Sequence, residues 1–214
     1  ILPLVPTIYS FLVQLYARGV YDVSSLRYCI SGGASLPEAL LKRVEEGLGV
    51  TVIEGYGLTE TSPVIAVNTM KDGSVPASVG PILPNIELEI VDDVGKSVKQ
   101  GKVGEIRVRG ETVMKGYWKK ADETSETLSA DGWLRTGDLG HMDEKGRLFI
   151  SSGRIKDLII RAGENVSPLA IENVLMSHEA ITEVAAVGIA DERIGEKVKV
   201  FAVLLEGAQA TEQE

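Results

Sequence analysis

Cysteine, clustered positive charge and long apolar runs are all scarce in this sequence of 214 residues. The single cysteine, Cys29, excludes an internal disulfide and is typical of a reducing compartment, so a cytoplasmic location is expected. The two histidines, His141 and His178, have no cysteine or histidine partners at the spacing of zinc ligands. A zinc site is therefore not expected.

Acidic residues outnumber basic ones, and the net charge is −9. The densest basic patch, Lys115, Lys119 and Lys120, is flanked by acidic residues, so a nucleic-acid partner is not expected. No run approaches the roughly 20 apolar residues that a transmembrane helix needs, which leaves peripheral membrane contact open. The apolar start lacks the features of a signal peptide and an initiator methionine, so we expect the chain to begin inside a longer protein.

The N-terminal part of the sequence has the pattern of a βαβ unit. A helix is expected from an N-cap at Thr7 to Gly19, followed by a buried strand at residues 26–30. A second helix at residues 35–48 starts with the capping-box pattern Ser-x-x-Glu, and a strand at residues 50–54 follows it. Because parallel strands bind ligands at their carboxyl ends, the glycines that follow both strands are candidate site residues.

The pattern changes after about residue 79. Residues 86–91 and 105–109 alternate apolar and polar side chains, which predicts half-buried antiparallel strands. A short helix is expected at residues 122–128. Beyond Gly153 we expect a strand, a helix that starts at Ser167-Pro168, and two further strands that form an α+β unit.

The stretch from Trp133 to Pro168 is rich in residues that can bind a nucleotide. Asp138, on an expected tight Thr-Gly-Asp turn, can accept hydrogen bonds from two neighbouring sugar hydroxyls, and Arg154 offers a fixed fork of donors to a ribose or phosphate. A turn aspartate paired with a surface arginine explains the same residues. The residues alone do not decide between the two interpretations.

A second candidate stretch, Gly55-Tyr-Gly-Leu-Thr-Glu-Thr-Ser-Pro63, follows a predicted strand. Its glycines allow close approach to a ligand, and Tyr56 offers a face on which an adenine can stack. Thr59 can donate to a phosphate oxygen, and Glu60 is a hard oxygen ligand suited to Mg²⁺. A plain glycine-rich turn is the alternative.

The motif T-G-D followed by G-R-I-K-D-L-I-I-R-A-G-E-N-V-S-P, together with Y-G-L-T-E, resembles the adenylate-forming superfamily of acyl-CoA synthetases, firefly luciferase and peptide-synthetase adenylation domains. The resemblance extends from Val5 to about Leu205. It implies an α/β and α+β fold, with the end of the large AMP-binding domain at residues 1–154 and the first part of the small C-terminal domain at residues 155–214. The large part would divide into a βαβ part (1–78) and a β-barrel-like subdomain (79–152).

The resemblance also implies roles for the motif residues. The adenine and acyl pocket would be lined by Gly32, Gly33, Ala34, Tyr56 and Gly57. The phosphates and Mg²⁺ would be bound by Thr59 and Glu60. The ribose would be held by Asp138 and Arg154. Lys156 would be the hinge between the two domains. Gly163 and Glu164 would line the passage of the CoA pantetheine arm.

Within the superfamily the motifs look most like those of fatty acyl-CoA synthetases, and long chains are favoured over medium ones. The implied chemistry makes acyl-AMP from a fatty acid and ATP and then an acyl-CoA. An enzyme that loads a carrier protein and a non-catalytic nucleotide-binding module are the alternatives. Luciferases keep a lysine where this chain has Ile160, which argues against light-emitting oxidation.

Two motifs of the superfamily are missing from the sequence. The Ser/Thr/Gly-rich phosphate loop does not occur, and no lysine sits in the distal adenylation motif. We therefore expect a fragment that does not turn over by itself.

Overall fold

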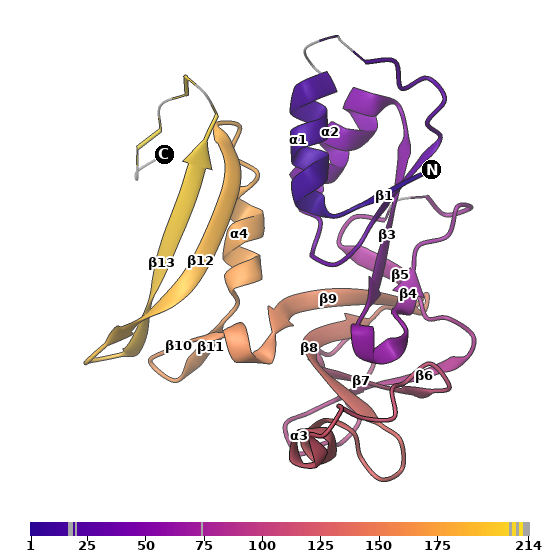
Figure 1. Ribbon diagram of the computed structural model, residues 1–214. Helices are drawn as coiled ribbons and strands as arrows, with labels where there is room; N and C mark the ends of the chain where they lie inside the picture. Colours follow the sequence, from indigo (N-terminus) through magenta and orange to yellow (C-terminus); the bar gives the residue numbers. More distant parts are fainter. Residues whose placement is uncertain (17–18, 20, 74, 206, 209, 212–214) are drawn as a thin grey trace.

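The computed structural model describes residues 1–16, 19, 21–73, 75–205, 207–208 and 210–211 (Figure 1). Its strands form three sheets, with the orders β1-β2-β3-β4, β5-β9-β8-β7-β6 and β11-β10-β13-β12. The sheets follow one another along the chain, and the third stands apart at the C-terminal end (Figure 1). The mixed α/β and α+β architecture expected from the sequence is confirmed.

The first sheet carries the expected βαβ unit. β1 (Leu2–Leu4), β2 (Tyr28–Ser31) and β3 (Thr51–Gly57) are parallel, and β4 (Val64–Val67) runs antiparallel to β3. The two helices, α1 (Pro6–Tyr16) and α2 (Glu38–Leu48), pack against each other and share a core with the sheet. The fully buried members of that core are Tyr9, Cys29, Val44 and Val52.

Both expected helix starts are wrong. α1 begins at Pro6, so Thr7 lies inside the helix, and the expected last residues 17 and 18 fall outside the described part. The Ser35–Glu38 capping box does not form: α2 begins at Glu38, with Pro37 as an N-cap that makes no side-chain cap bond. A helix that starts at Ser35 would need Leu36 in the α region, which the following proline disfavours. The expected end at Gly49 is confirmed, because this residue is left-handed with φ 65°.

The second sheet is antiparallel throughout. It contains β5 (Ser78–Pro81), β6 (Ile86–Val91), β7 (Gly104–Gly110), β8 (Leu134–Met142) and β9 (Arg147–Arg154). The short helix α3 (Ala121–Thr127) lies before β8. Across the described residues β5 and β6 are edges that do not pair with each other, so this β-rich part is an open sheet and not a closed barrel.

The core of the second sheet reaches back to the first. Ile106, Leu134 and Leu148 are fully buried and belong to the same apolar cluster as Ile65 of β4. Burying these side chains stabilises both sheets together, by about 2 kcal/mol for each large one. β3 therefore packs against β5 of the second sheet, and Tyr56 near its carboxyl end joins the same apolar cluster.

The third sheet begins after the 3-10 turn Ile155–Asp157. It contains β10 (Ile159–Arg161), β11 (Glu164–Val166), β12 (Ile181–Asp191) and β13 (Gly195–Leu204). Helix α4 (Pro168–Leu175) packs on β12, and its start is as expected: Ser167 is the N-cap, and its hydroxyl accepts a hydrogen bond from the Ala170 amide. None of the helices in the described ranges is long and apolar enough to cross a membrane.

Candidate functional site

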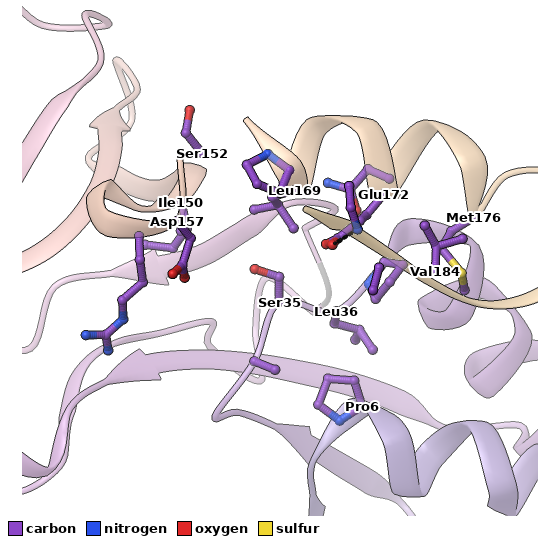
Figure 2. A pocket seen from close by; sticks show the side chains of 18 of the residues that line it. Pro6, Ser35, Leu36, Ile150, Ser152, Asp157, Leu169, Glu172, Met176 and Val184 are labelled. Carbon is purple, nitrogen blue, oxygen red and sulfur yellow. Dashed lines mark hydrogen bonds between the residues drawn. The ribbon is translucent and has the colours of Figure 1, made fainter. Parts of the chain in front are cut away.

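A large cleft, of about 1360 Å³, lies between the first sheet and the third. One wall comes from the start of α1, the loop before α2 and the carboxyl end of β3, and the other from α4 and β12. Figure 2 shows Leu36 on the first wall and Leu169 and Glu172 of α4 on the other. Seven of the sequence-predicted site residues line this cleft: Gly33, Ala34, Tyr56, Gly57, Asp138, Arg154 and Lys156.

The two motifs singled out in the sequence meet at Asp138. The Tyr56 hydroxyl, from β3, donates a hydrogen bond of 2.6 Å to Asp138 Oδ2, although 82 residues separate the two. The Arg154 guanidinium, at the end of β9, places its Nε 3.2 Å from Asp138 Oδ1. Asp138 is only 5% exposed, whereas the Arg154 side chain is 45% exposed. A buried carboxylate and a half-exposed guanidinium are thus presented together to the cleft.

Asp138 does not lie on a tight turn, as the sequence suggested, but inside β8. The β7–β8 register passes from Arg107↔Arg135 to Glu105↔Leu139, so three residues of β8 lie opposite Ile106 alone. Gly137 in this bulge has φ 71°. The Thr136 hydroxyl donates to the Ile106 carbonyl (2.7 Å) and accepts from the Asp138 amide (3.1 Å). A bulge re-aims side chains, and here it directs Asp138 toward Tyr56.

Burial and hydrogen bonding act against each other at Asp138. Burial raises the pKa of the carboxyl, while the hydrogen bond from Tyr56 and the charge of Arg154 lower it, and burial prevails. Burial also raises the pKa of Tyr56, with Asp138 adding to the effect, so the phenol stays protonated and donating. The site can therefore offer carboxylate acceptors and guanidinium donors side by side, the pattern that a vicinal diol of a sugar needs.

The Gly55–Gly57 segment is part of β3 and not the loop that its glycines suggested. It pairs with β4, with a register shift between Tyr56 and Gly57. A Cβ on Gly57 would lie 1.8 Å from the Pro63 carbonyl oxygen, so only glycine fits there. The Thr61 hydroxyl closes the turn that follows, because it accepts from the Leu58 amide at 3.0 Å. Tyr56 thus projects from a strand fixed on both sides.

Glu60 lies in a second, smaller cavity of about 360 Å³, and Arg154 lines both cavities. Glu60 Oε1 accepts a 2.9 Å hydrogen bond from the Tyr117 hydroxyl. Thr59 is exposed in the 3-10 turn Thr59–Thr61 and lines neither cavity. Tyr117 was missed in the sequence because its neighbourhood, G-Y-W-K-K, stood out only for charge.

A second residue that the sequence analysis missed is Glu54. It lines the cleft, and its Oε1 accepts a hydrogen bond of 3.2 Å from the Leu36 amide. Burial raises the pKa of Glu54 to about 7, and the Leu36 amide offsets only part of this effect. Ser31, its neighbour in register on β2, has a buried hydroxyl without a hydrogen-bond partner in the described part of the chain. A glutamate directly after the apolar pair Val52-Ile53 was the available signal.

The remaining predicted residues are placed less centrally. Gly32 follows β2 and lines neither cavity, although a Cβ there would lie 3.6 Å from the Gly55 carbonyl. Lys156 is exposed in the 3-10 turn and lines the cleft. Gly163 and Glu164 sit at the exposed end of the β10–β11 hairpin, outside both cavities.

The residues around Glu60 fit a magnesium ion that arrives with a polyphosphate. No group of three or more metal-ligating side chains occurs among the described residues, so a metal held by protein side chains alone is not supported. Mg²⁺ commonly takes one or two carboxylates and completes its shell with water and phosphate oxygens. Glu60, oriented by Tyr117, supplies one such carboxylate.

Comparisons with known proteins identify the family to which the chain belongs. The profile of the AMP-binding enzyme family matches residues 1–118, and that of the AMP-binding enzyme C-terminal domain matches residues 170–214. The chain is 42% identical over 213 residues to a long-chain-fatty-acid–CoA ligase of Bacillus subtilis, covering 99% of this chain and 38% of the relative. It is 45% identical over 187 residues to an indoleacetate–CoA ligase of Aromatoleum aromaticum, covering 87% and 36%.

A solved structure shows the same likeness. The crystal structure of ATP-bound MatB from Rhodopseudomonas palustris, 34% identical, superposes with a TM-score of 0.89 over 99% of this chain and 42% of that one. The apo crystal structure of MatB gives 0.72. The chain thus spans less than half the length of the relatives that it matches. Because the family profile covers more than half of the chain, this protein is a member of the AMP-binding, adenylate-forming enzyme family.

Proposed function

We propose that the whole protein is an ATP-dependent acyl-CoA synthetase that activates a fatty acid as acyl-AMP and transfers the acyl group to CoA. The observation that carries the proposal is the contact of Tyr56 and Arg154 with the buried Asp138 at the wall of the cleft. Long-chain-fatty-acid–CoA ligases among the relatives support the choice of acid and acceptor.

In the adenylation step the ribose would bind at Asp138 and Arg154, with the adenine against the Tyr56 ring. The substrate carboxylate attacks the α-phosphorus of ATP, the bond to the β-phosphate breaks, and pyrophosphate leaves. Glu60, which lines the smaller cavity, would hold Mg²⁺, and the ion would offset phosphate charge. Because Arg154 lines both cavities, its guanidinium could donate to the ribose or to the phosphates of the nucleotide.

In the second step the CoA thiolate attacks the acyl carbonyl of acyl-AMP, and AMP leaves. Gly163 and Glu164 would contact the pantetheine arm, but they lie outside the cleft, so this step needs a rearrangement about Lys156. The two MatB structures support such a motion. The ATP-bound form superposes on this chain with a TM-score of 0.89 and the apo form with 0.72, the kind of difference that a movement of one part against another gives.

An aromatic acid is the second candidate substrate, favoured by the 45% identity to an indoleacetate–CoA ligase. The carrier-protein acceptor and the non-catalytic module stay as alternatives. A cytoplasmic location follows from the single cysteine and is part of the proposal.

The test uses the full-length parent protein with ATP and Mg²⁺. It is offered hexadecanoate, octanoate or indoleacetate, with CoA or a phosphopantetheine carrier protein as acceptor, and thioester products are identified by mass spectrometry. We expect acyl-CoA with hexadecanoate, and no turnover by the 214-residue chain alone. Acyl transfer only to the carrier protein, or only from indoleacetate, contradicts the proposed acceptor or acid. Absence of pyrophosphate release with every acid contradicts adenylation.

A further inference from the structure

The β10–β11 hairpin joins the rest of the third sheet through few backbone bonds. β10 pairs in register with β13 at one position only, Arg161↔Gly195. Just beyond it, the Ala162 amide donates to the Ile194 carbonyl at 2.7 Å. By contrast, β12 and β13 pair continuously from Glu183↔Val203 to Asp191↔Gly195. A two-stranded hairpin is marginal by itself, so besides the fully buried Ile159 of β10 this attachment needs another support.

A side chain provides that support. The Ile160 amide donates a 2.5 Å hydrogen bond to Glu196 Oε2, where an ordinary ladder would use a backbone carbonyl. β13 itself continues to Leu204, but no second ladder pair with β10 follows Arg161↔Gly195. The carboxylate of Glu196 therefore replaces a missing strand partner.

The position of Glu196 is itself determined by β12. Its carboxylate lies over Gly188, where a Cβ would be 2.6 Å from Oε1 and 2.8 Å from Cδ. A glycine at position 188 thus leaves the space in which the carboxylate sits. Glu196 is half-buried and lines the cleft, although no role in binding was expected for it.

We propose that Glu196 is a positioning residue that couples the β10–β11 hairpin to the β12–β13 hairpin. The β10–β11 and β12–β13 hairpins then move as one body, and the turn that carries Gly163 and Glu164 reaches the cleft at a fixed place. The consequence for CoA rests on the proposed function, whereas the coupling itself does not. If the bond between Glu196 and the Ile160 amide had no structural effect, replacing Glu196 would change neither the coupling of the two hairpins nor the position of the turn.

The first arm of the experiment measures hydrogen exchange in the full-length protein by mass spectrometry, in peptides that cover residues 158–162. Glu196→Ala removes the acceptor, and Gly188→Ala displaces the carboxylate from the opposite strand. Both are expected to speed exchange in these peptides about tenfold, because one charge-assisted hydrogen bond is lost. Glu196→Gln keeps an acceptor and should restore most of the protection. Glu192→Gln, an exposed glutamate in the β12–β13 turn, is the matched control and should match the wild type.

The second arm measures the two half-reactions of the same variants. We expect the KM for CoA to rise about fivefold in Glu196→Ala and Gly188→Ala, while pyrophosphate exchange stays within about twofold of the wild type. Unchanged exchange in both variants overturns the coupling. Faster exchange with an unchanged KM for CoA overturns the positioning role.

Failure of the proposed function looks different from either result. If the wild-type parent forms no thioester with CoA, the proposed acceptor falls, and the exchange arm still decides whether Glu196 couples the two hairpins. If Glu196→Ala does not fold, Gly188→Ala decides both arms, because its added methyl group meets only the movable end of a side chain.

Discussion

The Asp138 site and the β10–β11 hairpin both carry residues of the motif that runs from Trp133 to Pro168, yet they are held in different ways. Asp138 is 5% exposed, and β3, β7, β8 and β9 all contribute to its hydrogen-bond network. Gly163 and Glu164 are exposed, on a hairpin held by one ladder pair, the Ala162 amide and the Glu196 carboxylate.

The Asp138 site is preorganised, whereas in the proposed function Gly163 and Glu164 reach their ligand only after a movement of the hairpin. In the proposed function, fixing Asp138 in a packed sheet lowers the cost of orienting a nucleotide. The hairpin has few backbone bonds to its sheet and is otherwise held by the fully buried Ile159 of β10, so its turn is the part with the fewest constraints. The predictions that follow test this contrast.

The largest effect is expected from Asp138→Ala in the full-length protein. The ribose and Arg154 lose a shared acceptor, so we expect the KM for ATP to rise about 100-fold, the equivalent of about 3 kcal/mol for two charge-assisted hydrogen bonds. Steady-state kinetics with varied ATP measure this. Asp143→Ala is the matched control, because Asp143 pairs with Arg147 on the same sheet but lines neither cavity. Equal losses in the two variants would place the nucleotide elsewhere.

A smaller effect is expected from Glu54→Gln on the pH dependence of stability. The pKa of Glu54 rises from 4.5 to about 7 on folding, so the folded protein retains a proton that the unfolded chain releases. The free energy of unfolding should therefore fall as the pH rises from about 4.5 to about 7. Glu54→Gln should remove this decline and add about 2 kcal/mol at pH 8.

Urea unfolding followed by circular dichroism at pH 5 and pH 8 measures the change. Glu38→Gln serves as the control, because Glu38 is an exposed residue of α2 paired with Lys42. The same pH dependence in wild type and Glu54→Gln would show that the Glu54 carboxyl is more hydrated than its burial implies.

The smallest effect is expected in the hairpin turn. Ala162 has φ 52° and Gly163 has φ 84°, the left-handed region that suits glycine at both positions. Ala162→Gly should slow amide exchange in residues 159–166 about twofold, because relief of strain exceeds the added freedom of the unfolded chain. Gly163→Ala should speed it about fivefold. Faster exchange in Ala162→Gly would mean that the alanine is not strained.

The sequence predicted elements and motif residues better than it predicted their surroundings. The βαβ unit, the antiparallel strands and the Ser167 cap depend on local patterns and are confirmed. The Asp138 bulge was read as a turn, because its shape depends on pairing with β7, 30 residues away. The start of α2 was misplaced although the deciding residue, Pro37, is local.

Other features could not be read from local patterns at all. The contact between Tyr117 and Glu60 spans 57 residues, and the burial of Glu54 comes from packing across two elements. The same holds for Glu196 and Ile160, which are 36 residues apart. Motifs identify which side chains to examine, while tertiary packing decides which partner each one meets.

Arg154 forms part of the wall of both cavities. Its guanidinium has one orientation at a time. A ribose that fixes this orientation from the larger cavity therefore also determines which N–H groups point to a phosphate in the smaller cavity. The two halves of a nucleotide would then strengthen each other's binding through a single side chain, and by linkage each would do so to the same extent.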